Sequence, residues 1–146
     1  MNRVAFAIRL FLAVVFLYSG VVKASGSAQF AIALAPFTLV PESWIHPLSI
    51  LLPFAEIAGG ALILGAPTKR IGAFLVLGLC LLFIIALSWA LANGIVVSCS
   101  CFGEDERPSV TKMTFALLRD AFLAALASIV LLTDRPRALE RTNFNN

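Results

Sequence analysis

Four long apolar stretches divide the chain, with shorter and more polar segments between them. They cover residues 4–22, 47–65, 71–92 and 114–132. Each is close to the roughly 20 residues that an α-helix needs to cross about 30 Å of hydrocarbon. Backbone N–H and C=O groups find no water inside a bilayer, so each stretch must satisfy these groups internally. The pattern predicts four transmembrane helices.

The connections predict how these helices are arranged. Residues 66–70 are short enough for a tight turn. Residues 23–46 form the longest connection, and their apolar character predicts a short helix at the membrane interface, broken at Pro36 and Pro41. Short connections make successive helices antiparallel. We therefore expect an all-α, polytopic membrane protein, an up-down four-helix bundle in a single domain over residues 1–146.

The composition supports a membrane protein. Hydrophobic residues make up 60% of the chain and charged residues 13%, whereas soluble domains have about half and a quarter. The Lys and Arg residues are scattered and form no basic run with aromatics, so we expect membrane lipid and no nucleic acid as partner. A secretory signal is an alternative for the first stretch, but Arg9 interrupts its apolar run.

The basic residues outside the stretches predict the orientation. If both termini are cytoplasmic, the inner segments hold Arg3, Lys69, Arg70, Arg135, Arg137 and Arg141, and the outer loops hold Lys23, Arg107 and Lys112. Positive charge collects on the cytoplasmic side. We therefore expect both termini inside, in a multi-pass protein of the inner (plasma) membrane. The loop 93–113 then faces the outside, where disulfides persist.

That outer loop carries Cys99 and Cys101 in the sequence "SCSCFG". Three interpretations compete: coincidence, a two-thiolate copper(I) site and a redox-active disulfide. A closed zinc site needs four ligands, and the one histidine, His46, lies in another loop; we expect no metal. Residues at i and i+2 are about 6.5–7 Å apart in extended chain, so a bridge between them is strained and easily reduced. Cys80 is expected to be a buried apolar residue.

Charged residues inside the apolar stretches are the second candidate site. An ionisable side chain at bilayer depth is a functional candidate by default. Glu56 and Arg119 are each about 14 Å from the outer end of their helices, which predicts an ion pair, and Asp120 could face Arg9. Two interpretations stay open: the charges fix helix packing, or they line a polar pocket for a ligand or a proton path.

These motifs together resemble a known family. The segments are "R-L-x5-F-L-Y-S-G-V-V-K" at 9–23, "F-x10-P" at 30–41, "L-P-F-A-E-I-A-G-G" at 52–60, "S-C-S-C-F-G" at 98–103 and "L-L-R-D" at 117–120. They occur in the order found in the MauE/DoxX-type redox-associated membrane proteins, especially the methylamine-utilisation MauE branch. The resemblance implies a four-helix bundle that works with thioredoxin-like partners in disulfide formation or thiol redox outside the cytoplasm.

Residue by residue, the resemblance marks Cys99 and Cys101 as the redox pair. It marks a polar core or ligand pocket formed by Arg9, Lys23, Glu56, Arg119 and Asp120. The preferred hypothesis is a membrane thiol–disulfide oxidoreductase, or its electron-transfer partner, acting on an extracytoplasmic thioredoxin-like protein. A quinone near Tyr18, Trp89 or the polar pocket is the candidate cofactor. The alternatives are a non-catalytic assembly subunit of a membrane complex and a small-solute or copper-handling protein.

Overall fold

The computed structural model describes residues 3–37, 40–97 and 109–133, and these residues form helices and their connections without any strand. The helices are α1 (Arg3–Ser25), α2 (Ser27–Leu34), α3 (Glu42–Leu64), α4 (Lys69–Ala92) and α5 (Val110–Thr133). All but α2 are long and apolar enough to cross a membrane. The predicted all-α class and the four predicted spans are confirmed.

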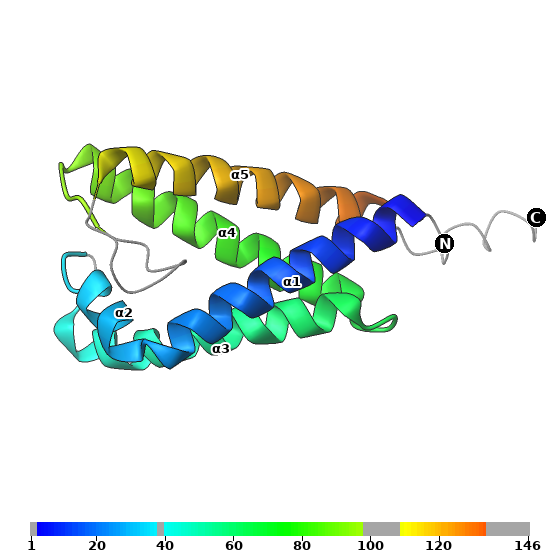
Figure 1. Ribbon diagram of the computed structural model, residues 1–146, viewed down its shortest axis with the longest axis horizontal. Coiled ribbons are helices and arrows are strands. Elements are labelled where there is room, and N and C mark those ends of the chain that lie inside the picture. The colour runs from blue at the N-terminus through cyan, green and yellow to red at the C-terminus, as the bar shows by residue number, and fades with distance from the viewer. Residues whose placement is uncertain (1–2, 38–39, 98–108, 134–146) are drawn as a thin grey trace, which may run out of the picture.

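The four long helices run up and down in chain order (Figure 1). The start of α1, the end of α5 and the turn between α3 and α4 lie at one end, which we call the turn end. The opposite end, the α2 end, holds α2, the start of α3, the end of α4 and the start of α5. α1 packs mainly on α3, and α4 packs on both α3 and α5. The predicted antiparallel bundle is therefore confirmed.

The helices extend beyond the apolar stretches that predicted them. α3 begins at Glu42, where the Trp44 N–H donates to the Pro41 carbonyl at 2.8 Å, and Pro47 lies inside the helix. The predicted stretch began at Pro47 because a hydropathy pattern marks the segment suited to hydrocarbon, not the polar turns that continue the same helix. α1 likewise extends to Ser25, so Lys23 belongs to its last turn and not to a loop.

The predicted short helix in the 23–46 connection is confirmed as α2. It ends at Leu34, before Pro36, and the Ala35 N–H still bonds to the carbonyls of Ala31 and Ile32. Phe30 points into the core and is 5% exposed. α2 therefore closes one side of the bundle at the α2 end. Its position at a membrane interface stays a prediction.

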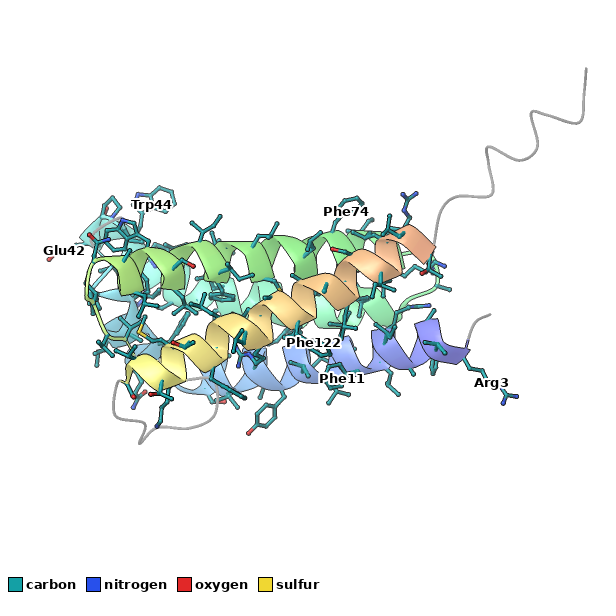
Figure 2. All side chains as sticks on the ribbon, turned by 90° about the horizontal axis from the view of Figure 1, so that it is seen from above. Arg3, Phe11, Glu42, Trp44, Phe74 and Phe122 are labelled. Atoms are coloured by element: carbon teal, nitrogen blue, oxygen red, sulfur yellow. The ribbon has the colours of Figure 1, made fainter. Side chains whose placement is uncertain are left out.

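The surface is apolar and the interior holds charge. Phe11 of α1, Phe74 of α4 and Phe122 of α5 are each about half exposed, and Phe74 points away from the bundle in Figure 2. By contrast, Lys23 is 4% exposed and Glu56 is 1% exposed. This distribution suits a protein surrounded by lipid, because hydrocarbon accepts apolar side chains and penalises charged ones. The chain is a multi-pass membrane protein.

Close packing of α1 on α3 positions the interior charges. A Cβ on Gly20 would lie 2.9 Å from the Pro53 carbonyl oxygen, and one on Gly60 would lie 3.1 Å from the Ala13 carbonyl oxygen. Small residues let two helix backbones approach in this way. Lys23 lies one turn beyond Gly20 on the same helix face, so the close approach brings its side chain against α3.

Candidate functional site

Lys23 and Glu56 form a buried ion pair between α1 and α3. The Lys23 Nζ lies 2.5 Å from the Glu56 Oε1. The same ammonium lies 4.4 Å from the centre of the Phe83 ring and 5.6 Å from that of Phe30. A cation near an aromatic face is attracted by the ring's negative centre, and more strongly where water is excluded. Lys23 is thus held by one carboxylate and two aromatic rings.

Arg119 and Asp120 form a second ion pair on α5. The Arg119 Nε and Nη2 donate to the Asp120 Oδ1 at 3.0 and 2.9 Å. The Asp120 side chain is 5% exposed and that of Arg119 is 23% exposed. We call Lys23, Glu56, Arg119 and Asp120 the charged cluster. Its formal charges cancel, which lowers the cost of burying it in a membrane.

All four members of the charged cluster line one cavity of about 160 Å³, which we call the α1 cavity. Its other walls come from α1, α4 and α5 and include Tyr18 and Cys80. Tyr18 is 54% exposed and stands where the cavity meets the surface, whereas Cys80 is 1% exposed. The α1 cavity therefore connects the charged cluster with the outer face of α1.

A second cavity of about 280 Å³, the α2 cavity, lies among α2, α3 and α4. Most of its lining is apolar, and its members include Phe30, Leu52 and Val97. Lys23, Phe83, Arg119 and Asp120 line both cavities. These four residues therefore separate the two cavities, and the charge can be approached from two sides of the bundle.

The structure brings the buried charges of α1, α3 and α5 together and shows two ion pairs among them. We predicted that Glu56 pairs with Arg119; the ion pair shown for Glu56 is with Lys23, and the one shown for Arg119 is with Asp120. Glu56 and Arg119 both line the α1 cavity, and their pairing stays a prediction. Gly20 and Gly60 bring α1 close to α3, and they are the residues from which the Lys23–Glu56 contact could have been inferred.

Arg9 lies elsewhere, so its predicted pairing with Asp120 is wrong. Its Nε donates to the Ile63 carbonyl and its Nη2 to the Leu64 carbonyl, both at 2.9 Å. It is 14 residues before Lys23 on α1, about 21 Å along the helix axis, and it lines neither cavity. The last carbonyls of a helix have no partner within the helix. Arg9 satisfies two of them at the end of α3.

Cys99 and Cys101 lie outside the described residues. The described chain reaches Val97, two residues before Cys99, and Val97 is 5% exposed. Its N–H donates to the Met113 sulfur of α5 at 3.4 Å. Val97 is thus fixed at the α2 end, beside the α2 cavity.

Tyr18 and Trp89, the two candidate quinone contacts, differ in whether they line a cavity. Tyr18 lines the α1 cavity. Trp89 is partly buried near the end of α4, packs with the apolar cluster around Phe37 and Leu87, and lines neither cavity. Among residues 3–37, 40–97 and 109–133, no group of three or more His, Cys, Asp and Glu side chains could hold a metal ion.

Comparison with known proteins gives one match. The model of the family described as methylamine utilisation protein MauE matches residues 1–133. This range includes the five helices, the charged cluster and the "SCSCFG" segment. No curated protein and no solved structure matches the chain.

Proposed function

Because this chain belongs to the MauE family of methylamine utilisation proteins and spans the membrane with four helices, we propose that it is a membrane thiol–disulfide redox protein. Cys99 and Cys101 are its redox pair. They exchange electrons with an extracytoplasmic protein of the thioredoxin-like type. The protein lies in the inner membrane with both termini in the cytoplasm and the cysteine pair on the outer face.

One observation carries this proposal: the α2 cavity borders both the charged cluster and Val97. Cys99 follows Val97 by two residues, and two residues of chain span at most about 7 Å. A redox pair at this place is within reach of a membrane cavity on one side and of a protein outside the membrane on the other. That is the position a transfer of electrons between the two requires.

The exchange proceeds by ordinary disulfide chemistry. A thiolate of the partner attacks one sulfur of the Cys99–Cys101 disulfide, which forms a mixed disulfide and releases the other cysteine as a thiolate. The partner's second thiolate then breaks the mixed disulfide. The partner has lost two electrons and two protons, and the Cys99–Cys101 dithiol has gained them; the reverse sequence reduces the partner.

A redox titration tests the proposal. The purified Cys80→Ser protein keeps only the two loop thiols and is equilibrated in glutathione buffers, after which free thiols are alkylated and counted by mass. We expect the pair to titrate between about −120 and −270 mV, the range of catalytic dithiols. A potential below about −300 mV is typical of a structural disulfide. Such a value would replace the redox function with that of an assembly subunit.

A further inference from the structure

The α2 cavity has two chemically different parts. Its walls are apolar side chains from three helices, among them Leu34, Leu48 and Leu87. One side is formed by Lys23, Arg119 and Asp120. An occupant that matches both parts has an apolar body and a compact polar end. A lipid tail would leave the charged side unmatched, and a polar solute would leave the apolar walls unmatched.

The cavity is also reachable from the lipid side. Its lining includes Leu82 and Ile85 of α4, which are 50% and 67% exposed on the outer surface of the bundle. An occupant dissolved in the bilayer can therefore enter between helices without crossing the polar headgroup layer. This entrance favours a lipid-soluble ligand over a water-soluble one.

Lys23 supplies the polar contact. Its ammonium has three N–H donors, and within the described part of the chain one of them bonds to the Glu56 Oε1. Phe30 and Phe83, the two rings beside the ammonium, also line the α2 cavity. A flat ring with a carbonyl oxygen can pack against these side chains and accept a hydrogen bond from Lys23. A cation at this place also stabilises negative charge that develops on such an oxygen.

From these features we infer that the α2 cavity binds the head group of a lipid-soluble quinone. The inference rests on the proposed function, because a redox pair needs a second reactant. The Cys99–Cys101 dithiol loses two electrons and two protons as its S–S bond forms. The quinone gains two electrons and two protons and leaves as the hydroquinone. This site differs from Trp89, which lines neither cavity.

Binding of radiolabelled decylubiquinone to the protein in lipid nanodiscs tests the site, with empty nanodiscs as the background. Ala86 of α4 lines the α2 cavity and is partly buried. Ala86→Phe fills the cavity and should weaken binding by about tenfold or more, which corresponds to 1.4 kcal/mol. Ala125 of α5 is exposed and lines neither cavity, so Ala125→Phe is the matched control and should bind as the unsubstituted protein does.

A second substitution guards against misfolding. If Ala86→Phe does not yield folded protein, Ala33→Phe on α2 fills the same cavity from the other side. Unchanged affinity in the folded variant overturns the inference. So does displacement of decylubiquinone by an equal concentration of lauric acid, because that result means that the cavity accepts a fatty acid as well as a quinone.

The outcomes separate this inference from the proposed function. The glutathione titration of Cys99 and Cys101 is made without quinone. If the pair titrates as a catalytic dithiol but decylubiquinone does not bind, the cavity assignment is wrong and the redox function stands. If decylubiquinone binds and Ala86→Phe weakens it while the disulfide resists glutathione, the cavity holds a quinone that the cysteines do not reduce, and the redox function is wrong.

Discussion

At the scale of single residues, the interior of this bundle depends on matching each buried charge with a neighbour. Glu56 has Lys23, Asp120 has Arg119, and Arg9 has two carbonyls at the end of α3. An unmatched charge in hydrocarbon costs several kcal/mol. The sequence showed that Arg9, Glu56 and Asp120 are buried, because they interrupt apolar stretches. It could not show the partners of Arg9, since backbone carbonyls leave no mark on a sequence pattern.

Glu56→Gln should destabilise the protein by roughly 3–5 kcal/mol, because it leaves the Lys23 ammonium buried without its carboxylate. Glu42 is exposed at the start of α3, so Glu42→Gln is the control and should change stability by about 0–1 kcal/mol. Thermal unfolding in detergent measures both.

The double variant Lys23→Met/Glu56→Gln tests the pairing itself. Removal of both charges should restore most of the stability that Glu56→Gln loses, because no uncompensated charge then remains buried. Glu56→Gln unfolding at the same temperature as the unsubstituted protein would contradict the assignment of this pair as a buried one.

At the scale of helices, small residues determine which faces meet. Gly72 of α4 packs against the backbone of α3, since a Cβ added to it would lie 2.7 Å from the Ile63 Cα. Gly78 of the same helix has no neighbouring atom within 4 Å of an added Cβ. Both glycines lower the helix propensity of α4 in the same way. They differ in whether an added Cβ would meet a neighbouring helix.

Gly72→Ala should therefore destabilise the bundle by about 1–3 kcal/mol, the typical cost of overpacking. Gly78→Ala should be neutral or stabilising by up to about 1 kcal/mol, because alanine is the better helix former. The comparison of the two unfolding temperatures checks this. A loss of stability in Gly78→Ala equal to that in Gly72→Ala would mean that helix contact is not the cause.

The sequence predicted that the four long helices exist, but it did not predict the residues at which they begin and end. The four apolar stretches predicted the four long helices of the described residues. A helix that crosses a membrane must be apolar over the thickness of the hydrocarbon layer, so hydropathy and length are enough to detect it. The extra turns at the start of α3 and the end of α1 are more polar than the apolar stretches. The second apolar stretch begins at Pro47, although α3 already begins at Glu42. For that reason Lys23 was counted in an outer loop, although the helix carries it into the core.

At the scale of the whole molecule, the up-down topology places both described chain ends at the turn end, and it places the end of α4 and the start of α5 at the α2 end (Figure 1). Topology alone leaves the side of the membrane open. The basic residues Lys69 and Arg70 at the turn end favour the cytoplasm for that end.

Labelling of introduced cysteines tests the orientation in intact cells, in a background with Cys80, Cys99 and Cys101 replaced by serine. Lys112→Cys, at the start of α5, should react with a membrane-impermeant maleimide. Lys69→Cys, at the turn end, should react only after the membrane is permeabilised. Reaction of Lys69→Cys from outside would reverse the orientation and place the cysteine pair in the reducing cytoplasm.

The central claim is that Cys99 and Cys101 exchange disulfides with a protein outside the membrane, and covalent trapping tests it most directly. One thiol forms the mixed disulfide and the other resolves it, so Cys101→Ser or Cys99→Ser should accumulate a covalent complex with a partner. The complex should appear in cells as a band that disappears on reduction, and Cys80→Ser should not accumulate it. The account is contradicted if neither variant traps a partner and both retain full function in cells.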